Sequence, residues 1–141
     1  MRFMFDHCLY FNTTALARRL EREWTDAFAP FGLTPAQAFM LRAVLARPGL
    51  VASELADVMA IARPTATRAL DGLEKLGLIV RQPTGTDGRE VAVFPTEEGA
   101  NLKRTLNDAS GAVTNRLKRL LGNDSFVDAV SKIKGVRSAL E

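Results

Sequence analysis

The stretch TATRALDGLEKLGL, residues 65–78, decides the fold because its hydrophobic period changes part-way along it. Apolar residues first recur every three or four positions, at Ala66, Leu70 and Leu73, which is the spacing of a helix with one buried face. From Leu78 onwards apolar and polar residues alternate, as is typical of a strand, and a polar glycine-rich run then separates this segment from a second β-type run. We therefore predict a helix over 62–76, followed by a β-hairpin over 78–94.

Three further helices are expected before this stretch. Apolar side chains at helical spacing predict a long first helix over 5–28. Thr34 followed by Pro35 is typical of a helix start, with a side-chain cap and a proline in the first turn. Ser53 is expected to cap a short third helix that ends just before the 62–76 segment.

Helical spacing returns after the hairpin and predicts two more helices, over 96–120 and 123–140. The order of elements is then four helices, a hairpin and two helices, which is mainly α with a small β-wing. Two short helices joined by a tight turn and followed by two strands form a winged helix-turn-helix. We expect a single domain over 1–141, with a winged helix-turn-helix lobe at 34–99 and dimerisation helices at 1–33 and 100–141.

The two ends of the chain indicate a homodimer. Their helices carry more apolar surface than one small winged domain is expected to cover. The helix after the hairpin also has a nearly heptad seam, suited to pairing across an interface, at Leu102, Leu106, Ala109, Val113, Leu117 and Leu120. The weaker alternative is that both ends pack on their own domain.

The polar face of the 62–76 helix indicates contact with double-stranded DNA. With Ala66 at the centre of the buried stripe, Pro64, Arg68, Asp71 and Gly72 fall on the far side, and Thr65 and Thr67 flank it. Small residues let a helix enter the major groove. Arg68, the neighbouring Arg63 and the threonines supply groups for base edges or phosphates. An isolated helix of this kind usually just faces water, so the hairpin that follows decides in favour of DNA.

The hairpin tip supplies a further candidate contact. Arg89 follows a glycine-rich turn, from which a long cation can reach the minor groove or a phosphate. Asp87 lies two residues earlier and can hold that guanidinium in a bidentate pair. The alternative is a surface hairpin with a weak salt bridge.

Composition excludes several other classes of protein. The 141 residues carry a net charge of +3, which is compatible with a polyanionic partner but does not identify one. One cysteine and one histidine cannot form an intramolecular disulfide or a tetrahedral zinc site, and we expect no metal or cofactor. There is no nucleophile–base pair with an orienting group, so the chain is not expected to be an enzyme. Without a membrane-length apolar run or signal peptide, it is expected to be cytoplasmic.

The segment from residue 53 to 102 resembles the MarR family of bacterial regulators. The family pattern T-x-T-R-x-x-D-x-L-E-x-x-G-L is matched by Thr65, Thr67, Arg68, Asp71, Leu73, Glu74, Gly77 and Leu78. Its wing pattern D-x-R, followed by alternating strand residues and T-x-x-G, is matched by Asp87, Arg89, Val91, Val93, Thr96 and Gly99. The terminal helices fit the same family, so the resemblance covers nearly the whole chain.

The resemblance implies a transcription regulator, most often a repressor, that binds a palindromic DNA site as a pseudo-twofold dimer. Each subunit would offer one recognition helix and one wing. Three positions depart from the family pattern: Ala62 and Pro64 stand where serine is common, and Gly72 stands where a cation is common. Fewer polar groups remain for reading bases, which leaves open a winged-helix protein-interaction module without DNA binding.

The resemblance also raises two sensing alternatives. Some members sense oxidants through a cysteine near the start of the first helix, where Cys8 lies. We expect Cys8 instead to be a small buried hydrophobe, because those sensors also use tyrosines and Tyr10 is the only one here. Other members bind small aromatic acids. Phe11, Trp24 and Phe39 are candidates to line a site for an aromatic or phenolic ligand, although aromatic residues at helical spacing more often form core.

Overall fold

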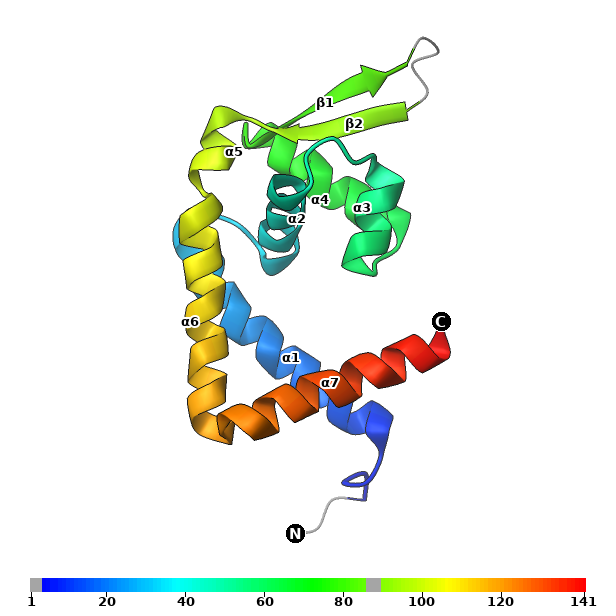
Figure 1. The fold of residues 1–141 in the computed structure, drawn as a ribbon, viewed down its shortest axis with the longest axis vertical. Coiled ribbons are helices and arrows are strands. Elements are labelled where there is room, and N and C mark those ends of the chain that lie inside the picture. The colour runs from blue at the N-terminus through cyan, green and yellow to red at the C-terminus, as the bar shows by residue number, and fades with distance from the viewer. Residues whose placement is uncertain (1–3, 86–89) are drawn as a thin grey trace.

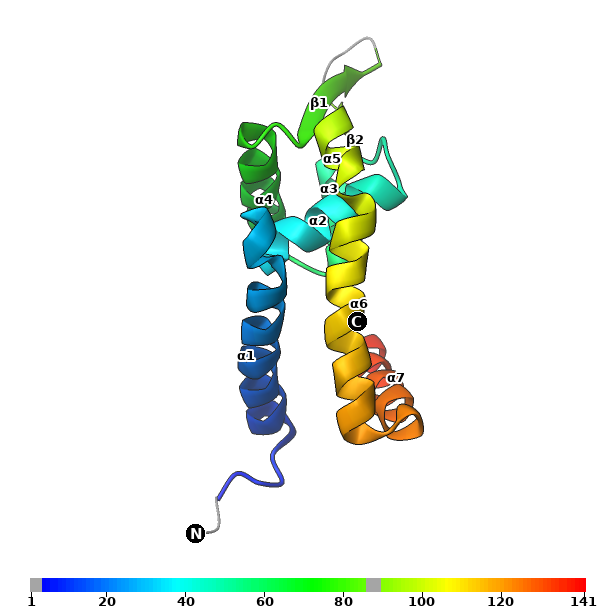
Figure 2. The ribbon, with the colours of Figure 1, turned by 90° about the vertical axis from the view of Figure 1, so that its left-hand side faces the viewer.

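The computed structural model describes residues 4–85 and 90–141. An upright helix, α6, joins a lobe at one end to helix α7 at the other (Figure 1). Helix α1 runs beside α6, as the turned view in Figure 2 also shows. The elements are α1 (Leu9–Phe28), the short 3-10 helix η1 (Ala29–Phe31), α2 (Pro35–Ala46), α3 (Ala52–Met59), α4 (Arg63–Lys75), β1 (Ile79–Thr84), β2 (Glu90–Pro95), α5 (Glu97–Asn101), α6 (Lys103–Leu121) and α7 (Asn123–Leu140). The predicted fold class, mainly α with a two-stranded wing, is confirmed.

Helix α2 begins where the sequence predicts. Thr34 adopts an extended backbone, and its Oγ1 accepts the Gln37 N–H at 3.2 Å. The Gln37 side chain reaches back, and its Oε1 accepts the Thr34 N–H at 3.0 Å. This reciprocal capping box satisfies two amide groups that the first turn leaves without helical partners. The start of the helix-turn-helix lobe is therefore encoded locally.

Helix α3 begins earlier than expected, and the prediction that Ser53 caps it is wrong. Its N-cap is Val51, and Glu54 closes the first turn by accepting the Val51 N–H at 3.1 Å. The cause is the wing: the backbone next to Val51 is held extended because Val93 of β2 donates to Leu50 O at 2.9 Å. The helix can therefore start as soon as this pairing ends.

The wing is an antiparallel pair with Ile79 opposite Pro95 and Thr84 opposite Glu90. Ile79 and Val93 are each 1% exposed, so the base of the hairpin is anchored in the core. Gly49 donates to Val93 O at 2.8 Å and brings the chain before α3 alongside β2. The predicted strands are confirmed. The wing projects from the lobe, and its base is packed in the core of the lobe.

The core forms where α2, α3 and α4 pack on one another. Its fully buried members include Leu41, Val44, Leu55, Leu70 and Leu73. Phe28 of α1 and Leu106 of α6 are also 0% exposed and belong to the same cluster. The lobe and the long helices therefore share one core, which fixes the direction in which α4 faces.

The heptad-like apolar seam predicted from Leu102 to Leu120 is interrupted, and its first half packs against another helix of the same chain. The helix predicted over 96–120 is two helices, α5 and α6, which meet at Leu102. Leu106 lies in the core, and Ser110 on the same side of α6 accepts the Trp24 indole N–H at 3.0 Å. The first half of the seam thus contacts α1 of the same subunit, so pairing across an interface is the wrong assignment for it. Leu120, near the end of α6, is 71% exposed.

Helix α7 has no buried residue, although apolar side chains recur along it at steps of three and four residues. Its large apolar side chains are 40–83% exposed, at Val127, Val130, Ile133, Val136 and Leu140. Its main packing partner is α6, and it lies at the far end from the wing (Figure 1). No helix in the described part of the chain is long and apolar enough to cross a membrane.

Candidate nucleic-acid interface

Helix α4 follows α3 through a turn of three residues. Ala60 ends α3 in the left-handed region, with φ 56°, and the Ile61 N–H returns to Ala56 O at 3.0 Å. Ala62 then adopts an extended backbone and precedes α4 without a side-chain cap, as the sequence predicts. Pro64 in the first turn supplies a favourable φ and lacks the amide that would go unpaired there. This turn sets α4 across the lobe as the second helix of a helix-turn-helix.

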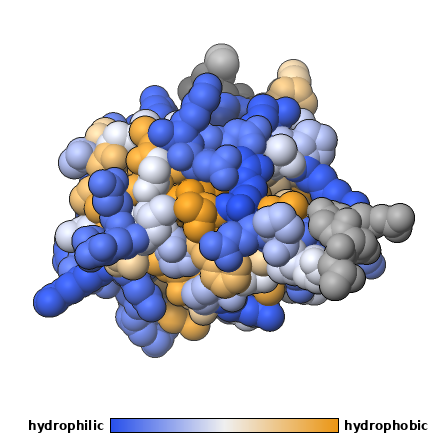
Figure 3. Space-filling model, turned by 90° about the horizontal axis from the view of Figure 1, so that it is seen from above, coloured by the Kyte–Doolittle hydropathy of each residue, from blue (hydrophilic) through white to orange (hydrophobic). Residues whose placement is uncertain are grey.

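The inward stripe of α4 is confirmed. Ala66, Leu70 and Leu73 are fully buried, whereas Arg63, Pro64, Thr67 and Arg68 are exposed. Viewed from the wing end, the surface is mainly hydrophilic, with hydrophobic residues in scattered patches (Figure 3). The helix therefore offers an outward face made of small, hydroxylic and cationic side chains.

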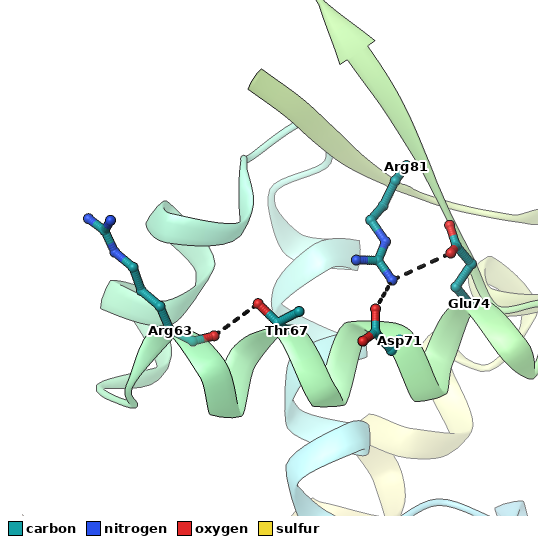
Figure 4. Close-up of polar contacts among 5 residues, drawn as sticks. All are labelled: Arg63, Thr67, Asp71, Glu74 and Arg81. Carbon is teal, nitrogen blue, oxygen red and sulfur yellow. Dashed lines mark hydrogen bonds and ion pairs between the residues drawn. The ribbon is translucent and has the colours of Figure 1, made fainter. Parts of the chain in front are cut away.

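Two hydroxyl groups on this face are bonded within the helix. Thr67 Oγ1 donates to the backbone oxygen of Arg63 at 3.0 Å, which leaves its lone pairs free to accept (Figure 4). Thr65, which is half-buried, accepts from Arg68 Nη2 at 3.2 Å. Within residues 4–85 and 90–141, neither Arg63 nor Arg68 pairs with a carboxylate. Both guanidinium groups are thus available to an external anion.

A cation from the wing lies over the C-terminal half of α4. Arg81 Nη2 on β1 donates to Asp71 Oδ1 and lies 3.4 Å from Glu74 Oε1 (Figure 4). The hydrogen bond that Arg81 donates to Asp71 is the main cause that raises the pKa of Arg81 above its ordinary value, and Glu74 adds to it. Sequence reasoning missed this cluster. The signal was strand alternation, since Arg81 shares a strand face with the buried Ile79.

Gly72 does not face outward as expected. A Cβ at this position would lie 2.6 Å from Gln37 Nε2, so α4 closely approaches the start of α2 here. Successive residues on a helix differ by about 100°, so Gly72 turns toward the lobe while Asp71 stays exposed. The remaining two expected contacts, Asp87 and Arg89, lie outside the described residues. The last described pair of the wing is Thr84 opposite Glu90.

Comparisons with known proteins identify this arrangement. The sequence pattern of the MarR family matches residues 31–90. A putative transcriptional regulatory protein for the hcr operon of Thauera aromatica is 32% identical over an alignment of length 114 that covers 70% of this chain and 69% of that protein. The chain belongs to the MarR family. Members of this family are transcriptional regulators, not enzymes.

Other MarR-related proteins match over different lengths. The uncharacterized HTH-type transcriptional regulator YybA of Bacillus subtilis is 32% identical over 84 residues, 60% of this chain and only 56% of that relative. The transcriptional repressor CouR bound to a 23-mer DNA duplex is 28% identical with a TM-score of 0.82, over 97% of this chain and 99% of that one. CouR bound to p-coumaroyl-CoA is 25% identical with a TM-score of 0.85, over 97% of both chains.

The candidate oxidant sensor Cys8 is exposed in this MarR-family chain, so the prediction that it is buried is wrong. Cys8 is the N-cap of α1, and its Sγ accepts the Phe11 N–H at 3.5 Å. The first turns of α1 extend beyond the shared core, which begins to cover the helix only near its other end. This location explains the exposure and adds no redox partner for the thiol.

The three aromatic candidates for a ligand site are not brought together. Phe11 is 38% exposed and contacts Phe5, with 5.6 Å between ring centroids. Trp24 lies 13 positions further along α1, about 20 Å at the rise of a helix, and its indole is bonded to Ser110. Phe39 on α2 packs edge-on against Phe28, with 5.9 Å between centroids. Phe39 borders a hollow.

That hollow, of about 360 Å³, lies between α2, α3 and α6. Its lining is mostly apolar, with two cations, and comprises Phe39, Arg42, Ala43, Leu45, Ala46, Met59, Lys103 and Asn107. The Arg42 guanidinium is 4.9 Å from the Phe39 ring centroid, and its Nε donates to Asn107 Oδ1 at 2.8 Å. Burial lowers the pKa of Arg42 below its ordinary value, because a partly dry site disfavours the charged form. Sequence reasoning did not single out Arg42.

Proposed function

We propose that this chain is a homodimeric transcription regulator that binds a palindromic double-stranded DNA site and represses the genes it controls. The outward face of α4 carries the proposal. It presents Arg63 and Arg68, without carboxylate partners in the described residues, beside the Thr65 and Thr67 hydroxyls. A helix in this position can enter the major groove, with guanidinium groups reaching guanine edges or phosphates. The DNA-bound repressor CouR, of the same fold, supports this function.

The apolar face of α7 supports the homodimer. Five large apolar side chains on this helix are 40–83% exposed, and exposed apolar surface of this kind marks a protein–protein interface. The exposed apolar residues at the start of α1, such as Leu9 and Leu16, extend the uncovered surface to a second helix. A second copy of the chain presents the same two surfaces, so a twofold arrangement covers both at once.

The test is a binding assay with a duplex selected from random DNA. We expect Arg63→Ala and Arg68→Ala each to weaken binding by about 1–3 kcal/mol, roughly 5- to 150-fold. Arg104→Ala is the matched control, because it removes the same charge from α6, where Arg104 is 93% exposed and only loosely paired with Asp108 at 3.9 Å. If both α4 variants bind like the control, DNA binding by this face is refuted and a protein-interaction module becomes the better interpretation.

The wing residues are part of the same proposal. Arg89 would contact the minor groove or a phosphate, with Asp87 orienting its guanidinium. We expect Arg89→Ala to weaken binding to every duplex and to reduce the slope of log affinity against log salt by about 0.9, the value for one lost phosphate contact. Transcription in vitro from a promoter that overlaps the selected site would test the repressor role, since an activator would raise rather than lower the transcript yield.

The hollow beside Arg42 favours a second function, relief of DNA binding by a small aromatic carboxylate. An apolar lining with two cations, Arg42 and Lys103, suits a ligand with an aromatic body and one negative charge. Arg42 is already oriented by Phe39 and Asn107, so little ordering is needed on binding. CouR, which has the same fold, is bound to p-coumaroyl-CoA in one structure, and this supports a ligand with an aromatic group.

Calorimetry with 4-hydroxybenzoate and its neutral counterpart 4-hydroxybenzamide tests the ligand class. We expect the carboxylate to bind more tightly, and Arg42→Met to remove that preference while Arg104→Met retains it. The carboxylate should also release the selected duplex. Equal affinity for both compounds in the unmodified protein would refute an anion-selective site at Arg42.

A further inference from the structure

Arg81 occupies an unusual place for a cation near a DNA-binding helix. Arg81 lies on β1, the first strand of the wing, and its side chain reaches two carboxylates on α4, Asp71 and Glu74, as Figure 4 shows. Its side chain is only 23% exposed, whereas those of Asp71 and Glu74 are 59% and 47% exposed. The contact therefore joins the two elements that the proposed function places next to DNA.

Considered without Arg81, the two carboxylates should weaken the proposed DNA binding. Asp71 lies three residues after Arg68, so both project from the same side of α4. A carboxylate at that place repels DNA phosphates. Simple electrostatics thus predicts that removing the charge of Asp71 tightens DNA binding.

We propose that Arg81 is a positioning residue that fixes the wing to α4, and that Asp71 is retained on the DNA side because it holds Arg81. The inference rests on the proposed DNA-binding function and assigns no phosphate contact to Arg81. Arg81 already has two carboxylate partners. If its guanidinium moved to a phosphate, Asp71 and Glu74 would be left as two unpaired negative charges beside the duplex. The pair instead makes α4 and the base of the wing one rigid unit, so that both reach adjacent grooves in a single geometry.

The contact is well placed for this role. Arg81 follows the buried Ile79 by two residues, so its backbone is held by the core of the lobe. Asp71 is held equally well, between the buried Leu70 and the tightly packed Gly72. Both ends of the ion pair thus leave backbone that the core anchors, so the pair can resist changes in the angle between helix and strand. Exposed pairs contribute about 0–1 kcal/mol to folding, so the variants should remain folded.

The deciding variant is Asp71→Asn, measured with the selected duplex and with an unrelated duplex. We expect it to weaken binding to the selected duplex by about 3- to 10-fold, within the usual range of coupling in an ion-pair network, although it removes a negative charge. Binding to the unrelated duplex should change much less, because nonspecific binding depends on charge rather than on geometry. Asp57→Asn on α3 is the matched control, since it removes an exposed carboxylate without breaking a pair in the described residues, and it should not weaken binding.

A double-mutant cycle separates positioning from a direct contact. In an Arg81→Ala background, Asp71→Asn should have no further weakening effect, because the partner is already gone. If Arg81 makes no phosphate contact, Arg81→Ala should not reduce the slope of log affinity against log salt by the value of one phosphate contact. Thermal unfolding, followed by circular dichroism, verifies that each variant is folded at the assay temperature.

Each outcome has one meaning. Tighter or unchanged binding by Asp71→Asn overturns the inference, and so does the same loss in both backgrounds. The proposed function stands in either case if Arg68→Ala still weakens binding relative to Arg104→Ala. If the unmodified protein selects no duplex, the proposed function itself fails, which is distinguishable from failure of the Arg81 inference.

Discussion

Gly99 is the point at which the first turn of α5 meets the backbone at the start of the wing. A Cβ there would lie 2.1 Å from the carbonyl oxygen of Leu78, a backbone atom that cannot swing away. We expect Gly99→Ala to lower the free energy of unfolding by about 1–3 kcal/mol, the usual cost of overpacking. Gly111→Ala is the control, because nothing lies within 4 Å of its Cβ position and alanine favours a helix by about 1 kcal/mol.

Urea unfolding at one protein concentration measures both changes, since the stability of a dimer depends on concentration. A loss of stability in Gly99→Ala together with a gain in Gly111→Ala is the expected pattern. An unchanged midpoint for Gly99→Ala would mean that the wing and α5 are not packed as closely as the structure shows.

The hydrogen bond from the Trp24 indole to Ser110 joins α1 to α6 across 86 residues of sequence. Ser110→Ala removes the acceptor and leaves a partly buried N–H without a partner, so we expect unfolding to be easier by about 1–3 kcal/mol. Trp24 is the only tryptophan, and its fluorescence therefore reports directly on this contact during urea unfolding. Ser131→Ala on the exposed surface of α7 should leave the midpoint unchanged. Equal midpoints for the two variants would contradict the assigned role of Ser110.

At the residue scale, the sequence predicts helix caps and buried helix faces better than it predicts which side chains contact one another. The Thr34 cap and the buried face of α4 follow from local rules, and both are confirmed. Ser53 and Gly72 were misassigned because the pairing of the chain with β2 and the close approach of α4 to α2 are tertiary events. The partners of Arg81 were missed for the same reason, since ten residues and a turn separate it from Asp71.

At the scale of elements, the hydrophobic period predicts the long helices but neither the break at Leu102 nor what each helix packs against. The α6 seam has the spacing of helix pairing, and helix pairing is what the structure shows, yet its first half pairs with α1 of the same chain. The pattern for an internal pair and that for a pair between subunits are the same, because both bury one stripe every three to four residues. The two cases differ only in whether other elements of the same chain already bury the apolar stripe. No residue of α7 is buried in this way.

Helix α7 therefore carries the prediction for assembly. Ile133 lies in the middle of its apolar face and is 43% exposed in the single chain. We expect Ile133→Glu to dissociate the dimer, because burying an unpaired carboxylate in an apolar interface costs several kcal/mol. Ser131→Glu adds the same charge two residues away, on another side of the helix, and should leave the dimer intact. Sedimentation equilibrium measures both, and an unchanged mass for Ile133→Glu would exclude this face as the interface.

At the scale of the whole molecule, one subunit has one α4 and one wing, so in the proposed dimer high affinity requires both subunits to bind the same duplex. Helix α6 joins the lobe to α7, and we expect the shared core through Phe28 and Leu106 to keep the lobe from turning independently. The two recognition helices of a dimer are then held at one separation and on one side of the DNA.

A duplex with five base pairs inserted between the half-sites tests this rigidity. The insertion turns the second half-site by about half a helical turn to the opposite side of the DNA. We expect binding to fall to the level of a single half-site, and the slope of log affinity against log salt to fall to about half, because only one lobe still neutralises phosphates. A duplex of the original length with the same central bases substituted should bind almost as well as the selected site. If the lengthened site retains full affinity, each lobe can turn relative to α1, α6 and α7. The α6 connection would then be a hinge rather than a rigid link.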